Sequence, residues 1–147
     1  MRRKGKEKKT SDNILLLLAS LFFHKKPIKG RTRFQKTIFL LKRKYKISFD
    51  FNFRPYYYGP YSEGLSDLVF LLRALNFLEE TTDHLGIGII RYNYQLTEKG
   101  KKYFKMLENN AESETQKAIV NLEKKISEVS KLSTPDLISE SKSLMKS

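Results

Sequence analysis

The chain has 147 residues, the size of one domain with a small appended element, and its formal net charge is +13. It contains no cysteine, which excludes disulfides, thiolate catalysis and cysteine-based zinc sites. Residues 1–60 hold 17 Lys and Arg against 3 Asp and Glu, whereas residues 61–147 hold 12 against 13. The charge therefore favours a polyanionic partner that contacts the first 60 residues; the alternative is a basic, solubilising surface.

Residues 1–11 are expected to form a basic, disordered arm. The first ten residues carry six Lys or Arg, one acid and no apolar side chain after Met1. Such an arm either lies along DNA phosphates, through Arg2, Arg3 and Lys4, or is only a solvated tail.

The first helix is predicted over Asp12–His24. Its apolar run, Ile14–Phe23, has ten residues, about half of the roughly 20 that a bilayer-spanning helix needs. No small-residue cleavage site follows the run, so we interpret it as a buried core helix and not as a signal peptide.

A second helix is predicted over Arg31–Tyr45, after a turn marked by Pro27 and Gly30. Apolar residues recur at helical spacing and define its core side: Phe34, Ile38, Leu41 and Tyr45. Basic residues define another side that we expect to be exposed: Arg31, Arg33, Lys36, Arg43 and Lys44.

Residues 47–54 alternate between large apolar and polar side chains, a pattern typical of a half-buried strand. A proline ends this strand, and the turn that follows, Tyr56–Ser62, contains four tyrosines. These rings either complete the core or stack on bases or on a protein. A third helix is expected with Gly59 as its cap and Pro60 as its first residue, running to about Asn76. Its core side is expected to contain Leu65, Leu68, Val69, Leu72 and Leu75.

Residues 87–104 predict a strand that turns into a helix, after a polar turn around Asp83–Gly88. Apolar and aromatic residues alternate along the strand on one face: Ile90, Tyr92, Tyr94 and Leu96. Thr97 is a suitable N-cap for the last helix of the domain, which would carry Tyr103, Phe104 and Leu107 on one side. The order helix, strand, turn, strand, Leu-Thr-x-x-Gly, helix resembles the wing and last helix of PadR-like and MarR-like regulators. The resemblance implies a winged helix-turn-helix, whose third helix enters the major groove of DNA.

Four apolar residues near the C-terminus recur at intervals of three, four and three: Ile119, Leu122, Ile126 and Val129. This spacing is interpreted as the interface of a homodimer, and the alternative is a helix that packs back on its own domain. A short final helix is expected from Thr134 to about Met145.

Catalytic and metal-binding patterns are not found in the sequence. No Gly-rich phosphate loop occurs, and the two histidines, His24 and His84, belong to different elements without a carboxylate at ligand spacing. The acids Glu79, Glu80 and Asp83 are interpreted as a solvated strand edge. We expect no enzymatic activity, no cofactor and no metal.

Residues 30–41, with a Gln-Lys pair at Gln35 and Lys36, and the Gly-Pro-Tyr-Ser sequence of residues 59–62 form a second pattern. They resemble YwgA-like proteins, which are bacterial and archaeal winged-helix domains, and more distantly Panacea-type antitoxin domains. The similarity covers about residues 14–104. Antitoxin-like relatives act by protein contact as well as, or instead of, DNA contact, so the resemblance implies both possibilities. The Phe-rich strand and Tyr-rich turn depart from the PadR plan, which has a tight turn there.

We therefore expect an α+β fold, with a winged helix-turn-helix and a small antiparallel β-sheet over residues 12–108 and a C-terminal helical extension over residues 109–147. The preferred function is a cytoplasmic transcriptional regulator or nucleoid-associated protein that grips duplex DNA mainly through phosphates. The expected DNA contacts are Arg2, Arg3, Lys4, Lys29, Arg31, Arg33, Gln35, Lys36, Tyr57, Ser62, Ser66, His84 and Arg91.

Two other functions remain open at this point, and no membrane partner is expected. The exposed side of the third helix carries two acids and one arginine, Glu63, Asp67 and Arg73, which is a poor major-groove surface. A protein-interaction module, antitoxin-like or an assembly adaptor, would use this side and the Tyr-rich turn. A single-stranded RNA binder would use the N-terminal arm and the tyrosines.

Overall fold

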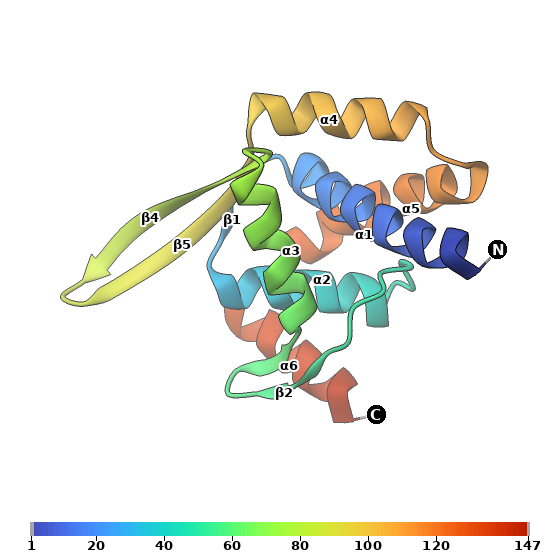
Figure 1. Ribbon diagram of the computed structural model, residues 1–147. Coiled ribbons are helices and arrows are strands. Elements are labelled where there is room, and N and C mark those ends of the chain that lie inside the picture. Colours follow the sequence, from blue (N-terminus) through green and yellow to red (C-terminus); the bar gives the residue numbers. More distant parts are fainter. Residues whose placement is uncertain (1, 147) are drawn as a thin grey trace.

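The computed structural model describes the backbone of residues 2–146 and the side chains of residues 12–146 (Figure 1). Helices and small antiparallel sheets alternate along this part of the chain, so the predicted α+β class is confirmed. The elements are α1 (Arg2–His24), β1 (Ile28–Lys29), α2 (Arg31–Arg43), β2 (Arg54–Tyr56), β3 (Gly59–Tyr61), α3 (Glu63–Ala74), β4 (Leu78–Gly86), β5 (Ile89–Leu96), α4 (Glu98–Asn109), α5 (Ser113–Ser130) and α6 (Thr134–Lys146).

The main sheet has the strand order β1-β5-β4, and all its pairs are antiparallel. The short strand β1 pairs only with Asn93 and Tyr94 of β5. The outer half of the β4–β5 hairpin therefore has no third strand, and it projects away from the helices (Figure 1). Its turn lies at Gly86–Gly88, slightly later than the predicted turn, where Gly88 takes a positive φ of 73°.

Helix α1 is the centre of the core, as its apolar run predicted. Leu16, Leu17 and Leu18 are fully buried, and α1 packs against both α4 and α5. The helix has the bounds Arg2–His24 and not the predicted start at Asp12. The predicted basic arm falls on residues 1–11, whose side chains lie outside the described residues, so it stays a prediction.

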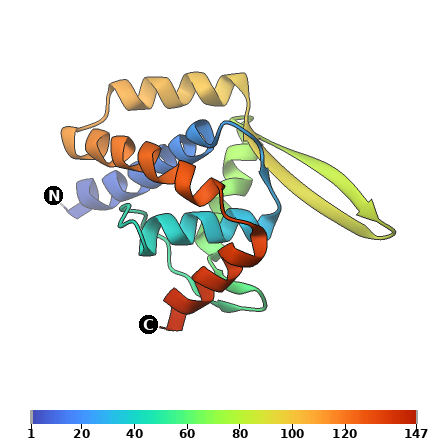
Figure 2. The same ribbon diagram turned by 180° about the vertical axis from the view of Figure 1, so that it is seen from behind.

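The C-terminal helices α5 and α6 pack against their own chain (Figure 2). The four residues predicted for a dimer interface, Ile119, Leu122, Ile126 and Val129, are at most 2% exposed and belong to the core. Their assignment to a dimer interface is wrong, because α1 and α2 each present apolar surface that α5 covers. The alternative, a helix packed back on its own domain, is what the structure contains.

The Phe-rich segment before β2 pairs with no strand, so the predicted strand over residues 47–54 is wrong for all but its last residue. Phe49 and Phe51 are buried, as the alternation predicted. Side chains take the place of a neighbouring strand: Asn13 exchanges two hydrogen bonds with the backbone of Asp50, and the Lys42 ammonium donates to the Phe51 carbonyl. The alternation of apolar and polar residues therefore predicted the burial of Phe49 and Phe51 correctly, but it did not show whether the segment pairs with another strand.

The Tyr-rich turn is a short hairpin, β2–β3, in which Gly59 and Pro60 belong to a strand and not to the start of a helix. The N-cap of α3 is Ser62 and its first residue is Glu63, each three residues later than predicted. The Ser62 hydroxyl accepts a hydrogen bond from the Leu65 amide at 3.2 Å. Leu65 and Leu72 are buried as predicted, whereas Leu75 is 46% exposed because α3 ends before it.

The N-cap at Thr97 is confirmed, since its hydroxyl accepts a hydrogen bond from the Gly100 amide at 2.9 Å. Helix α6 begins at Thr134 as predicted. Within residues 2–146, no helix combines the length and the apolar content that crossing a bilayer requires.

Candidate functional site

The Gln-Lys pair of α2 and the Gly-Pro-Tyr-Ser turn meet in the structure. The Gln35 amide oxygen accepts from the Ser62 amide at 2.8 Å, and its nitrogen donates to the Ser62 carbonyl and to the Ser66 hydroxyl, both at 3.0 Å. Gln35 and Ser62 are buried. Their predicted contact with DNA is therefore wrong; together they hold the hairpin and the start of α3 onto α2.

Lys36 is also unavailable to phosphates, because it is 3% exposed beneath the hairpin. A Cβ on Gly59, which has a φ of 111°, would lie 3.2 Å from Lys36 Cε, so only glycine fits this close approach. Burial, and then the nearby positive charge of Lys142, lower the pKa of Lys36 to about 8. Its predicted DNA contact is wrong for the same reason.

The C-terminal helix covers the remaining basic side of α2. Arg33 donates to the carbonyls of Ser130 (3.1 Å) and Leu132 (2.6 Å), in the turn between α5 and α6. Lys44 pairs with Glu140 of α6. Arg33 therefore binds this turn in place of a phosphate, and α6 lies where the predicted DNA surface was expected.

Two other predicted DNA residues, Arg31 and Arg91, have partners within the chain. The Arg31 guanidinium lies 3.8 Å from the centre of the Tyr92 ring, and its Nε donates to the Tyr94 hydroxyl at 3.3 Å. Arg91 donates to Asp83 at 2.7 Å; hydrogen bonds from Arg91 and then Asn93 lower the pKa of Asp83.

The other predicted contacts differ in their exposure. Lys29, Tyr57 and His84 are exposed, and Ser66 is partly buried. The side chains of Arg2, Arg3 and Lys4 lie outside the described residues. The structure therefore does not assemble the predicted set into one phosphate-binding surface.

The segment that forms α3 and the β4–β5 hairpin is acidic. Residues 63–96 contain two arginines against five Asp and Glu, a net charge of −3. The Tyr-rich hairpin adds Arg54, so residues 54–96 carry a net charge of −2. On α3, Phe70 is 68% and Leu71 is 47% exposed. Further large apolar side chains are exposed on the Tyr-rich hairpin, namely Tyr56, Tyr57 and Tyr58, and at the outer end of β4–β5, namely Leu85, Ile87, Ile89 and Ile90. We call Phe70, Leu71 and the three hairpin tyrosines the α3 face.

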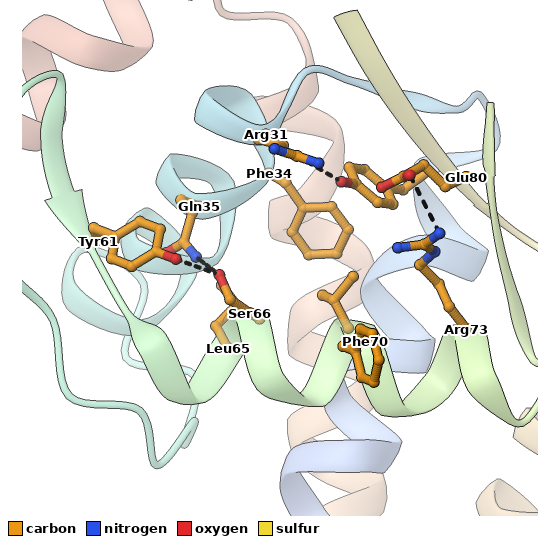
Figure 3. Close-up of a pocket in the computed structure, with 11 residues that line it drawn as sticks. Arg31, Phe34, Gln35, Tyr61, Leu65, Ser66, Phe70, Arg73 and Glu80 are labelled. Atoms are coloured by element: carbon orange, nitrogen blue, oxygen red, sulfur yellow. Dashed lines mark hydrogen bonds and ion pairs between the residues drawn. The ribbon is translucent and has the colours of Figure 1, made fainter. Parts of the chain in front are cut away.

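A cavity of about 270 Å³ opens between α2, α3 and the main sheet. Figure 3 shows Arg31, Phe34 and Gln35 of α2 across the cavity from residues of α3. Its lining residues are Arg31, Phe34, Gln35, Tyr61, Leu65, Ser66, Val69, Phe70, Arg73, Glu80 and Tyr94.

Charged groups and a hydroxyl form a chain along one wall of this cavity. Glu80 Oε1 lies 3.3 Å from an Arg73 nitrogen, and Arg31 donates to the Tyr94 hydroxyl. Burial, and then the adjacent Glu80 carboxylate, raise the pKa of Tyr94 to about 12. Glu80 Oε2 is buried and has no hydrogen-bond partner in the described part of the chain. The wall therefore presents both an unused acceptor and guanidinium groups.

Sequence reasoning missed this cavity because it assigned Glu80 to a solvated strand edge and gave Tyr94 only a place on one face of the following strand. The two residues are direct cross-strand partners in β4–β5, so a register derived from the hairpin could have brought them together. None of the described side chains forms a group of three or more His, Cys, Asp or Glu that could hold a metal ion.

No protein-family model matches the chain. The chain is similar to the uncharacterized protein YwgA of Bacillus subtilis (strain 168), with 36% identity over 89 residues. The alignment covers 58% of this chain and 51% of that protein, so this chain spans about half the length of the curated relative. This similarity supports the YwgA-like relationship that the Gln-Lys pair and the Gly-Pro-Tyr-Ser turn indicated.

Proposed function

We propose that this chain is a winged-helix domain that binds a protein partner through its α3 face. The element order, with a strand between the first two helices and a hairpin after the third, supports the winged-helix assignment. The observation that carries the functional proposal is the net charge of −3 over residues 63–96, the segment that a winged helix would present to DNA.

The charge of this segment opposes DNA binding. Neutralising phosphates requires free cations, but Arg73 lies against Glu80 and Arg91 against Asp83. Asp67 is exposed on α3 itself, where it would face the polyanion. A nucleic acid would therefore meet repulsion where it needs attraction.

The same surface suits a protein. Exposed aromatic side chains such as Tyr57 (82% exposed) and Phe70 are the type that anchor protein interfaces, because they bury a large area at a small entropic cost. The acidic residues around them favour a partner segment with apolar side chains flanked by Lys or Arg. We therefore assign the partner chemistry as a basic, amphipathic protein segment.

The test is photo-crosslinking of the full chain in its own cells, with a benzophenone amino acid placed at Tyr57, Phe70 or, as a control, Val120. Val120 is 54% exposed on α5, far in sequence from the α3 face. We expect a discrete adduct at positions 57 and 70 that protease removes and nuclease does not, and that Asp67→Lys weakens. Nuclease-sensitive adducts at position 70, or equal protein adducts at position 120, would refute the proposal.

Duplex DNA binding is the second candidate, and the observation that favours it is the excess of positive charge in residues 1–60. If the chain binds duplex DNA only through non-specific electrostatic attraction, fluorescence anisotropy should show DNA binding at low salt and none at physiological salt. Retained affinity at physiological salt, together with loss on replacing Arg2, Arg3 and Lys4 by glutamine, would restore the DNA function.

A further inference from the structure

The cavity beside α3 is lined by a carboxylate, that of Glu80, and by a guanidinium, that of Arg31, and each can form hydrogen bonds with a ligand. The Glu80 side chain is only 11% exposed, and its Oε2 is buried without a geometric hydrogen-bond partner among the described residues, although the Tyr94 hydroxyl lies against the same carboxylate. A buried carboxylate oxygen without a donor is unfavourable unless a ligand or water supplies one. The position of Glu80 at one end of the cavity wall is visible in Figure 3.

Arg31 supplies the opposite charge. Its Nε donates to the Tyr94 hydroxyl and its plane stacks on Tyr92, which fixes the guanidinium. Arg31 lines the cavity and is exposed, and its guanidinium carries four further N–H donors beside the one on Nε. The Tyr94 hydroxyl accepts from this guanidinium and also lies against the Glu80 carboxylate, so both charged groups adjoin one hydroxyl at the cavity.

Apolar side chains line another part of the wall, beside the polar groups of Gln35, Tyr61 and Ser66. Phe34 and Leu65 are buried, and Val69 and Phe70 complete the lining. The cavity volume of about 270 Å³ is far larger than the roughly 10–15 Å³ that a single water needs, so it has room for a small organic ligand.

We propose that this cavity binds a free α-amino acid with an apolar side chain. The ligand carboxylate accepts hydrogen bonds from the Arg31 guanidinium, and its ammonium group donates to Glu80 Oε2. The side chain of the ligand packs against Phe34 and Val69. The proposal involves binding alone, with no covalent step. It does not depend on the protein partner proposed above.

Only a free amino acid satisfies both ends of the site. A carboxylic acid without the amine leaves Glu80 Oε2 without a donor, and an amine without the carboxylate makes no charged hydrogen bond with Arg31. A protein chain carries its amine and its carboxylate on different residues, so a peptide terminus also satisfies one end alone. The chemistry therefore separates this proposal from capture of a partner side chain.

The test is isothermal titration of the full chain with L-leucine, L-methionine and L-phenylalanine, beside 4-methylpentanoate and 3-methylbutylamine. We expect at least one amino acid to bind with a Kd below about 1 mM. Both single-ended analogues of leucine should bind at least about tenfold more weakly, the loss expected for one charged hydrogen bond. Absence of binding by all three amino acids at about 10 mM, or equal binding of 4-methylpentanoate, would overturn the proposal.

Two variants and a matched control connect the binding to this cavity. Glu80→Gln should weaken binding about tenfold or more, whereas Glu79→Gln, the neighbouring residue on the other face of β4, should leave it unchanged. Val69→Phe should abolish binding by filling the cavity, and it serves as the second variant should Glu80→Gln unfold. Unchanged affinity in the folded Val69→Phe variant would refute the assigned location.

Discussion

Replacing Gly100 with alanine should destabilise the fold, even though alanine is the better helix former. Gly100 is the third residue of α4 and is buried. A Cβ at this position would lie 1.9 Å from the Phe77 carbonyl oxygen and 2.9 Å from its carbon, where no atom fits. The Phe77 carbonyl would have to move, and it already accepts a hydrogen bond from the Thr97 amide at 3.1 Å.

The magnitude follows from three contributions. Alanine gains about 1 kcal/mol over glycine in a helix interior. Forcing an extra methyl group into a packed site costs about 1–3 kcal/mol. Loss of the hydrogen bond between Thr97 and Phe77 costs a further 0.5–1.5 kcal/mol or so. Gly100→Ala should therefore lower the free energy of unfolding by about 0.5–3.5 kcal/mol.

The assay is urea denaturation followed by circular dichroism, with Gly64→Ala as the control. Gly64 is the second residue of α3, and a Cβ there would meet only Phe51 at 3.7 Å and the Ser62 hydroxyl at 3.8 Å, which are ordinary contacts. Gly64→Ala should raise the free energy of unfolding by about 0.5–1 kcal/mol. If both substitutions shift stability in the same direction, the close approach at Gly100 is not what governs it.

Two further predictions concern α2. Gln35→Ala should lower the free energy of unfolding by about 2–4 kcal/mol, since three hydrogen bonds are lost; the exposed Gln116→Ala should change it by less than about 0.5 kcal/mol in the same urea titration. Because the pKa of Lys36 is about 8 when folded and about 10.5 otherwise, the folded chain binds fewer protons between these values, so stability should rise with pH across this window. Lys36→Met should remove that rise and raise the melting temperature at pH 7, and a rise that persists in the variant would show that another group causes it.

Local signals located several elements correctly. Thr97 and its glycine three residues later predicted the start of α4, and the structure adds the reason for the glycine in Leu-Thr-x-x-Gly, namely contact with the Phe77 carbonyl. Alternation identified β5 and the buried sides of Phe49 and Phe51. These features depend on nearby residues, so the sequence contains the information directly.

The wrong predictions share a dependence on residues far away in sequence. Arg33 was expected at a phosphate, but it donates to carbonyls of Ser130 and Leu132, about one hundred residues later. Gln35 finds Ser62 across 27 residues. A charge pattern shows which side of a helix is polar, but not whether water, phosphate or another segment of the chain satisfies it. The cavity was missed for the same reason, since its wall combines α2, α3 and the β4–β5 hairpin.

The packing of α5 on α1 sets the order in which this protein can fold during synthesis. Helix α1 leaves the ribosome before α5, and α5, which buries part of its apolar run, is made about a hundred residues later. Bringing together two segments that far apart is slow relative to local helix formation. The leucines of α1 should therefore stay exposed until α5 has been made. Nascent chains that stop before Ser113 should therefore need chaperone protection, and folding of the core should complete only after α5 emerges.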